Sequence, residues 1–447
     1  MKLLLFLFQG LVIGGLALQD EAQGDGPFKE PLEPGLGDVT FSTRANIELQ
    51  GFKVVRVVPK NSGQLGFLRV LLNQNRKMFD IDFWKEPNEV GVAVDMMVSP
   101  GDLKKLSTYF DQHGLDVSYL VQDVEEAVEK ENERHAGTLF STYSGFDYGR
   151  YHSLNEINSE LADLANRYSN ARVFSIGNSY EGKSMKAIEI KGSKKLNKKT
   201  FFFNCAIHAR EWVTAATCMY MINQMLTQYG KDPSVTAMLD KMDWVVLPVF
   251  NVDGYSYTWN GGRARMWRKT RSRGYRCYGA DPNRNWNYKW GGVGTSRSEC
   301  DDTYHGRKAF SEVEVLNVAQ YLYRRKQDLA GYMDIHAYSQ LWMTPWGYTR
   351  SYPNDYREMM RVANIAVRAL RNVYGTYYRA GTSSNIIYAT SGGSDDWTYG
   401  ALGLVYSYAL ELRDRGRYGF LLPANQIIPT GRETFAAMKA MAAAMRV

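Results

Sequence analysis

The sequence predicts an α/β fold, because strand-like and helix-like segments follow one another along the chain. The apolar run at residues 200–203 is typical of a buried strand, and the amphipathic stretch at residues 212–228 is typical of a helix. A second apolar run, residues 329–335, carries His336 at its carboxyl end. Open α/β sheets bind their ligands at this end of their strands, so we expect a functional site there.

The chain has 447 residues, 45% of them hydrophobic, and can therefore bury a full-size core and hold two globular units. Residues 1–17 combine Lys2 with an apolar run and small residues near its end, which predicts a signal peptide. A membrane anchor is the alternative, but Gln9 and Gly10 interrupt this short run. Residues 18–40 are rich in Gly, Pro and acidic residues and predict a disordered leader.

Residues 41–125 alternate short strand-like runs with helical stretches. We expect strands at residues 53–57 and 92–98, and helices at residues 63–74 and 100–113. The segment from residue 123 to residue 134 carries five Glu and predicts an exposed helix that ends at two cleavable residues, Lys130 and Arg134.

Two imidazoles and one carboxylate give the strongest functional signal. His208 and Glu211 lie on the turn between the strand at residues 200–203 and the following helix, and His336 is the third member. Such a set binds catalytic zinc and leaves the fourth position to water. An H-x-x-E tetrapeptide alone is a weak signal, because a lone His beside a strand is more often a packed or capping group. H-E-x-x-H is absent, and Trp212 replaces the second His of H-x-x-E-H.

Five stretches, two of which contain these three residues, resemble the zinc metallocarboxypeptidases of the pancreatic A/B type, and procarboxypeptidase B in particular. They are NCAIHAREW at 204–212, MWRKTRS at 266–272, DPNRNW at 281–286, IHAYSQ at 335–340, and ELRD with RYGFLLP at 411–414 and 417–423. They occur in family order across nearly all of residues 140–447. The resemblance implies a catalytic domain with a central mixed sheet flanked by helices, and one Zn²⁺ held by His208, Glu211 and His336.

The resemblance also assigns chemical roles around the metal. Glu411 takes the place of the general base, which removes a proton from the attacking water. Arg268 takes the place of the group that polarises the scissile carbonyl and stabilises the oxyanion. Asp281 corresponds to the acceptor that fixes the tautomer and orientation of His208.

Substrate binding by the family uses a guanidinium that holds the C-terminal carboxylate, and here the matching residue is Arg284, with Asn283 beside it. Tyr388 would close over the bound terminus, and Arg210 would hold substrate backbone further from it. Tyr338 would line a substrate subsite, although a half-buried core tyrosine is an equally good interpretation from sequence alone.

The preference for a C-terminal side chain depends on Asp395, which matches the base of the family's specificity pocket. A desolvated carboxylate there favours Lys or Arg, because an ion pair with either side chain compensates the free energy that the carboxylate loses when it is removed from water. Gly381 and Ser383 stand where small residues keep the pocket deep in the B type. Ser383 is not the glycine usual in vertebrate B enzymes, and Asp395 could face solvent, so A-type preference for apolar ends remains the alternative.

All four cysteines lie within residues 135–447, which suits a secreted protein with two disulfides. The residues alone allow three pairings, and the resemblance selects Cys205–Cys218 and Cys277–Cys300. A Cys₄ metal site lacks any C-x-x-C pair and is disfavoured. The resemblance further implies cis peptide bonds at Ala337-Tyr338, Pro345-Trp346 and Arg413-Asp414.

By resemblance, residues 41–125 form an inhibitory prodomain, an open antiparallel α/β sandwich, followed by an activation segment at 126–134 and the catalytic domain at 135–447. Charge supports docking of the two parts. Residues 18–134 carry 13 basic and 21 acidic residues, whereas residues 135–447 carry 40 basic and 26 acidic ones. Opposite signs favour association. Activation by a trypsin-like protease at Lys130 or Arg134 follows.

The sequence therefore predicts a secreted, extracellular, monomeric zymogen that removes C-terminal Lys or Arg from peptides and proteins. Its expected partners are these C-termini, the activating protease and its own prodomain; neither nucleic acid nor membrane is expected. The basic run at residues 263–276 has no nucleic-acid-reading module beside it. A module that binds C-termini without cutting is the remaining rival, but Glu411, Arg268 and all three ligands are retained.

Overall fold

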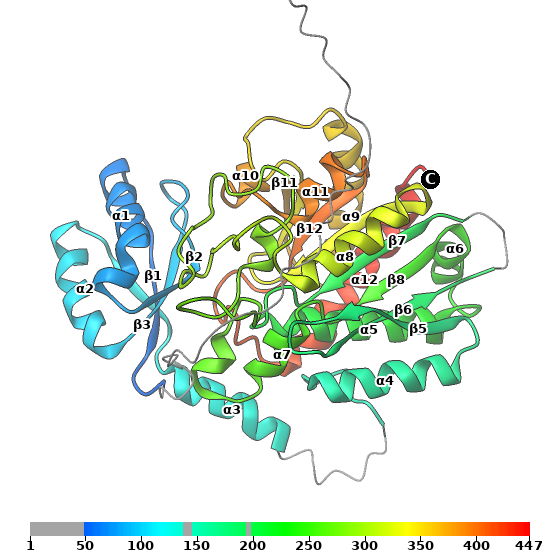
Figure 1. Ribbon diagram of the computed structural model, residues 1–447, viewed down its shortest axis with the longest axis horizontal. Helices are drawn as coiled ribbons and strands as arrows, with labels where there is room; N and C mark the ends of the chain where they lie inside the picture. The colour runs from blue at the N-terminus through cyan, green and yellow to red at the C-terminus, as the bar shows by residue number, and fades with distance from the viewer. Residues whose placement is uncertain (1–48, 137–144, 194–197) are drawn as a thin grey trace, which may run out of the picture.

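The computed structural model describes residues 49–136, 145–193 and 198–447, and each of its two units is built on a separate sheet (Figure 1). The predicted signal peptide at residues 1–17 and the leader at residues 18–40 lie outside the described residues. Within the part that is described, no helix combines the length and the apolar character needed to cross a bilayer.

The N-terminal domain, residues 49–121, is a four-stranded antiparallel sheet in the order β2-β3-β1-β4. Its elements are β1 (Lys53–Val57), α1 (Ser62–Met78), β2 (Ile81–Lys85), β3 (Val94–Val98), α2 (Pro100–Gln112) and β4 (Val117–Val121). Helix α2 begins at Pro100, and the side chain of Ser99 accepts a hydrogen bond from the Asp102 N–H there. A connecting helix, α3 (Val124–Ala136), follows the domain.

The two faces of this sheet have different partners. Along β3, Met96 and Val98 join the N-terminal domain's own core, which helices α1 and α2 cover on the left of Figure 1. Met97 joins instead the core of the C-terminal unit, and Asp95 contacts Tyr338 there. Side chains of a strand alternate between faces, so one face of the sheet builds its own core and the other docks.

The C-terminal domain, residues 145–447, has an eight-stranded mixed sheet in the order β11-β10-β12-β9-β7-β8-β6-β5. Its strands are β5 (Ala171–Asn178), β6 (Ser184–Ile190), β7 (Thr200–Cys205), β8 (Asp243–Leu247), β9 (Leu329–His336), β10 (Leu341–Thr344), β11 (Arg379–Thr382) and β12 (Ser407–Glu411). Its α-helices are α4 (Leu154–Arg167), α5 (Trp212–Gln228), α6 (Pro233–Lys241), α7 (Val252–Thr258), α8 (Val313–Arg324), α9 (Tyr356–Tyr374), α10 (Ser383–Ile386), α11 (Ser394–Gly400) and α12 (Ile427–Ala444). Short 3₁₀ helices are η2 (Gly262–Met266), η3 (Pro282–Arg284), η4 (Lys326–Asp328) and η5 (Ala424–Gln426).

The predicted α/β fold with a mixed sheet flanked by helices is confirmed. Strands β7, β9 and β12 are neighbours and run parallel, with Cys205 opposite Ile335 and His336 opposite Glu411. The carboxyl ends of these strands therefore meet at one edge of the sheet. The apolar helix α5, which follows β7, packs against α12.

Two disulfides join Cys205 to Cys218 and Cys277 to Cys300, which is the pairing that the resemblance implies. The first connects the end of β7 to helix α5. The three expected cis peptide bonds, at Ala337-Tyr338, Pro345-Trp346 and Arg413-Asp414, are also present.

Candidate metal centre and active site

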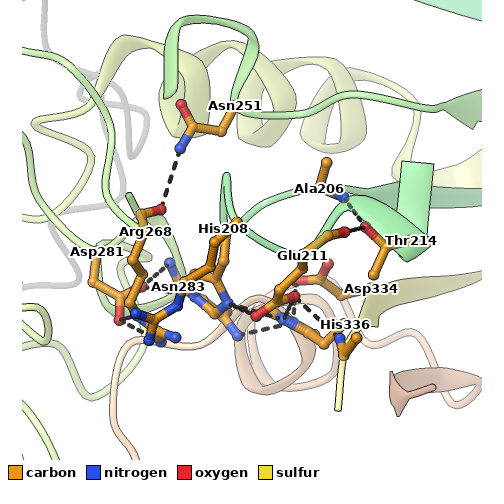
Figure 2. A network of polar contacts seen from close by, with 12 residues as sticks. Ala206, His208, Glu211, Thr214, Asn251, Arg268, Asp281, Asn283, Asp334 and His336 are labelled. Atoms are coloured by element: carbon orange, nitrogen blue, oxygen red, sulfur yellow. Dashed lines mark hydrogen bonds and ion pairs between the residues drawn. The ribbon is translucent and has the colours of Figure 1, made fainter. Parts of the chain in front are cut away.

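His208, Glu211 and His336 meet at the carboxyl edge of the sheet (Figure 2). His208 Nδ1 lies 2.8 Å from Glu211 Oε1 and 3.2 Å from His336 Nδ1, and His336 Nδ1 lies 3.3 Å from Glu211 Oε2. All three side chains are buried. The loop after β7 and the end of β9, which are far apart in the sequence, thus bring three ligand atoms to one point.

The separations of these ligand atoms fit a zinc ion. Tetrahedral zinc with bonds of about 2.0–2.1 Å separates its ligand atoms by about 3.3 Å. Imidazole nitrogen and carboxylate oxygen are ligands that zinc accepts. Burial opposes ionisation of Glu211, but His208 and His336 outweigh it and hold the pKa of that carboxyl below its usual range.

A second carboxylate orients each imidazole. His208 Nε2 lies 3.1 Å from Asp281 Oδ1, and His336 Nε2 lies 3.1 Å from Asp334 Oδ2. Such contacts fix which ring nitrogen faces the metal and raise the basicity of the ligand. Asp281 was expected from the sequence in this position.

Sequence reasoning missed Asp334, although it stands in the same D-I-H tripeptide as His336. Residues two apart on a strand project from the same face, so this spacing could have identified it. Asp334 also accepts hydrogen bonds from Asn204 at 2.6 Å and from Ser394 at 2.7 Å. These contacts hold the carboxylate, and through it the His336 ring, against the sheet.

Glu411 ends β12 beside His336 and lines the same cavity of about 70 Å³ as the three ligands. Burial raises the pKa of Glu411 to about 8, and its Oε2 has no hydrogen-bond partner among the described residues. Arg268 also lines this cavity, and Asp281 accepts two of its N–H groups at 2.8 Å and 3.1 Å. A buried carboxyl group and a fixed positive charge therefore flank the ligand group.

Arg284 and Asn283 lie on the 3₁₀ helix η3 and reach the cavity with Tyr388. The Nε and Nη1 groups of Arg284 donate to the carbonyls of Gly294 and Asn283, each at 2.9 Å, which fixes the plane of the guanidinium. Burial raises the pKa of Tyr388 to about 12, so its hydroxyl stays protonated. Asn283 Nδ2 lies 3.3 Å from His336 Nε2, which adds a contact with the metal ligands.

Asp395 lines the cavity and is 6% exposed, so the carboxylate does not face bulk solvent. Burial raises its pKa, and the side chain of Ser383 lies 3.0 Å from Asp395 Oδ2. Its other acceptor contact is with the Asp396 N–H, so neither of these neighbours is a cation.

The N-terminal domain covers the residues that the sequence associates with upstream substrate. Asp82 Oδ2 lies 2.7 Å from Arg210 Nη1, and the hydroxyl of Tyr338 donates to Asp95 at 2.7 Å. Arg56 pairs with the same Asp95 at 2.6 Å. Tyr338 is therefore engaged at the domain interface, and the opposite charges predicted from the sequence meet there.

Trp84 and Lys85, the last two residues of β2, line the cavity itself. Lys85 lines it and interacts electrostatically with Glu411. Burial raises the pKa of Glu86, and the charges of Arg284 and Arg268 oppose this shift. The N-terminal domain thus brings a cation into the cavity and a carboxylate that interacts electrostatically with two of its arginines, a feature that the sequence did not reveal.

Comparison with known proteins gives two family matches. Residues 157–437 match the zinc carboxypeptidase family, and residues 55–131 match the carboxypeptidase activation peptide. Carboxypeptidase A2 of Rattus norvegicus is 38% identical over 393 residues, which cover 87% of this chain and 92% of that relative. Carboxypeptidase B of Astacus astacus is 45% identical over 300 residues, which cover 66% of this chain and 97% of that relative.

Among solved structures, thrombin activatable fibrinolysis inhibitor superposes with a TM-score of 0.79 at 35% identity. The match covers 88% of this chain and 98% of that one, so both domains are included. The chain therefore belongs to the zinc carboxypeptidase family as a zymogen, with the activation peptide in its N-terminal part and the zinc site at its His-Glu-His group.

Proposed function

We propose that the C-terminal domain, once released, removes C-terminal Lys or Arg from peptides and proteins. The observation that carries this proposal is the environment of Asp395. This carboxylate is 6% exposed and is held by a hydroxyl and a backbone N–H, and no Lys or Arg of the described residues pairs with it, so its charged form lacks a counter-charge. An entering ammonium or guanidinium compensates this charge, whereas an apolar side chain leaves it buried without a counter-charge.

The carboxylate of the substrate's terminus would bind Arg284, with Asn283 beside it and the Tyr388 hydroxyl as a further donor. Arg284 suits this role because its guanidinium plane is already fixed by two backbone carbonyls. A peptide held at this point has its last peptide bond near the metal ligands. An internal peptide bond has no carboxylate for Arg284, and this limits cleavage to the end of the chain.

His208, Glu211 and His336 would hold one Zn²⁺, oriented by Asp281 and Asp334. When bound, this ion acts as a Lewis acid that polarises the scissile carbonyl and makes a water molecule more acidic. Glu411 would accept a proton from the attacking water and pass it to the leaving amine. Its unpartnered, buried Oε2 supports this role, since no other contact competes for the proton.

Arg268 would stabilise the negative charge that develops on the carbonyl oxygen. Its bond to Asp281 keeps the guanidinium in place before substrate arrives. Tyr338 and Arg210 would contact residues upstream of the scissile bond.

Latency would end when a trypsin-like protease cleaves the connecting helix α3 at Lys130 or Arg134. Residues 1–17 would direct secretion. Residues 41–125 would act as the inhibitory prodomain, residues 126–134 as the activation segment, and residues 135–447 as the catalytic domain. The match of residues 55–131 to activation peptides supports this division.

A-type preference is the second candidate, and a specific observation favours it. Met343, Ile387 and Ala409 line the same cavity as Asp395 and offer apolar contacts to an aromatic or aliphatic end. Several relatives with similar sequences are named carboxypeptidase A. The aliphatic stems of Lys and Arg can also use these contacts, which leaves the charge of Asp395 as the deciding feature.

The deciding experiment compares the activated enzyme on four peptides that differ only in a C-terminal Arg, Lys, Phe or Leu. We expect kcat/KM for Arg and Lys to exceed that for Phe and Leu by at least ~10-fold, because a buried unpaired carboxylate costs roughly 1–3 kcal/mol. Equal rates would contradict the B-type proposal. C-terminally amidated versions serve as the control for recognition of the free carboxylate.

A further inference from the structure

Residues 80–86 of the N-terminal domain lie along the approach to the zinc site in extended form. Ile81 and Phe83 of this segment pack into the N-terminal domain's own core. The alternate residues face the C-terminal domain, where Asp82 pairs with Arg210 and the Trp84 ring lies 4.9 Å from the Phe420 ring. One side of this segment therefore contacts the enzyme at every second residue.

The outermost of these contacts joins Asp80 to Arg263 on η2. The segment then passes Arg210 at Asp82 and enters the zinc cavity at Trp84 and Lys85. From Asp80 towards Glu86 the chain runs in the direction from Arg263 to Arg284.

A bound substrate would run in the same direction, because its last residue sits at Arg284 and its earlier residues extend away from the metal. A substrate and β2 share the rise of an extended chain, about 3.3 Å per residue, so if the last residue takes the place of Glu86, residues roughly four to seven positions from the C-terminus match Asp82 and Asp80. Asp82 and Asp80 precede Glu86 by four and six positions. The N-terminal domain thus occupies the path of upstream substrate residues with carboxylates.

A cavity of about 250 Å³ lies between the two domains beside this path. Arg268 lines both this cavity and the zinc cavity, so the two spaces lie next to each other. The C-terminal domain's side of it is lined by basic and aromatic residues: Arg263, Trp267, Arg268, Arg271, Arg276 and Tyr278. Asp302 is a carboxylate of the same lining.

The guanidinium of Arg210 is held by its own domain. Its carbon lies 4.2 Å from the centre of the Phe420 ring, and its Nη1 group donates to the carbonyl of Met266 at 3.4 Å. These contacts do not involve the N-terminal domain and remain after its removal. Release of the N-terminal domain removes the carboxylates of Asp80 and Asp82 from Arg263 and Arg210, and substrate carboxylates would restore these pairs.

We infer that the mature enzyme selects substrates with acidic residues roughly four to seven positions before the C-terminus, and that Arg210 and Arg263 determine this preference. The inference rests on the proposed function, because it takes Arg284 as the place of the terminal carboxylate. The substrate class is a peptide or protein whose final residue follows an acidic stretch.

The test uses the activated enzyme and decapeptides that share their last three residues. Two residues are varied together in each peptide: the fourth and sixth from the C-terminus in one register, and the fifth and seventh in the other. In each register both varied residues are Asp, both are Asn or both are Lys. In one of the two registers we expect initial kcat/KM to rise about tenfold from Asn to Asp and to fall from Asn to Lys, with smaller differences at high salt. Rates within twofold of one another in both registers would overturn the inference.

Variants assign the effect to its residues. Arg263→Glu should shift the preference from the Asp towards the Lys peptides, and the conservative Arg263→Lys should keep the Asp preference. Arg368→Glu on α9, outside the linings of both cavities, is the matched control and should leave the Asp-to-Lys ratio as in the wild type. An Asp preference unchanged in Arg263→Glu and in Arg210→Gln would refute the assignment.

Each peptide is made with C-terminal Arg and with C-terminal Phe. If only the Phe series is cleaved, the B-type proposal fails, while the Asp-to-Lys ratio is still measured within that series. If both series are cleaved without regard to upstream charge, the present inference fails and the carboxypeptidase function stands.

Discussion

The carboxylate of Asp82 lies 2.7 Å from Nη1 of Arg210, and the Arg210 side chain is only 2% exposed. This ion pair joins the N-terminal domain to the loop that carries His208 and Glu211. Because both partners are shielded from water, the pair is screened less than a surface pair.

Asp82→Asn should loosen the N-terminal domain, since the amide leaves the Arg210 guanidinium shielded without a counter-charge. A penalty of roughly 1–3 kcal/mol is expected for such a loss. After cleavage by trypsin, the delay between loss of the intact chain on a gel and appearance of activity should shorten several-fold. Asp116→Asn is the matched control, because Asp116 pairs with Lys60 on the exposed side of the same domain. Equal delays in both variants would show that this contact does not hold the domain.

Glu411→Gln should lower kcat by about 10²–10⁴-fold, because the amide cannot accept the proton of the attacking water. Zinc content and the inhibition constant of a C-terminal product should change little, since the ligands and Arg284 remain. Steady-state kinetics with metal analysis checks both expectations. A loss of zinc equal to the loss of activity would point to a structural effect instead.

Asp395→Asn keeps the shape of the side chain and removes its charge. We expect kcat/KM for C-terminal Arg to fall by at least ~10-fold while that for C-terminal Leu or Phe stays equal or rises. Asp395→Ile should extend this to a reversed preference. Unaltered selectivity in both variants would mean that another group recognises the terminal side chain.

Removal of zinc should abolish activity and lower the melting temperature of the activated enzyme. Without the ion, two imidazoles and a carboxylate crowd one buried point, and the binding free energy of the metal no longer stabilises the folded state. Dialysis against a chelator, followed by titration with Zn²⁺, should restore activity at one equivalent. Full activity at a zinc content near zero would contradict the assignment.

Glu314 gives a prediction about pH. Burial, together with the nearby Glu312, raises the pKa of Glu314 to about 8. Between its ordinary unfolded value near 4.5 and this value, the folded state holds a proton that the unfolded state has lost, so stability falls as pH rises. Glu314→Gln should therefore raise the free energy of unfolding at pH 8 by at least ~1 kcal/mol and have little effect at pH 4.

Denaturant unfolding at both pH values measures this difference. Glu358→Gln is a control of opposite sign, because Arg361 holds the pKa of Glu358 at about 2 and stabilises its charged form. A Glu314→Gln variant that is destabilised equally at pH 4 and pH 8 would show that folding does not raise the pKa of Glu314.

The zinc ligands could be predicted because they depend on short-range rules. His208 and Glu211 share one turn, and His336 ends an apolar strand that parallel pairing brings to the same edge. Asp334 follows from the same alternation along β9. These local features alone are a weak signal, and the resemblance of five stretches to the zinc metallocarboxypeptidases was needed to assign the ligand group.

The contacts of the N-terminal domain could not be predicted in this way. Net charge indicated that the two parts attract, but charge alone does not select Arg210 for Asp82 or Arg263 for Asp80. These pairs are fixed by which face of the sheet docks and by the shape of the surface it meets. The approach of Glu86 to Arg284 depends on the same docking and has no local signal in the sequence.

The pairing of β2 with β3 contains an irregularity, in which Phe83 faces Met96 and Lys85 faces Asp95, with Trp84 as the extra residue. In a regular strand, Trp84 and Lys85 would project to opposite faces, yet both line the zinc cavity. The irregular register of β2 therefore determines which residues of the N-terminal domain enter the zinc cavity. Deletion of Trp84 would make the pairing regular and leave Lys85 opposite Asp95 on the docking face, but it would remove the ring that packs on Phe420 and lines the zinc cavity. Asp80 and Asp82 would keep their contacts, giving a zymogen that is attached but less completely closed.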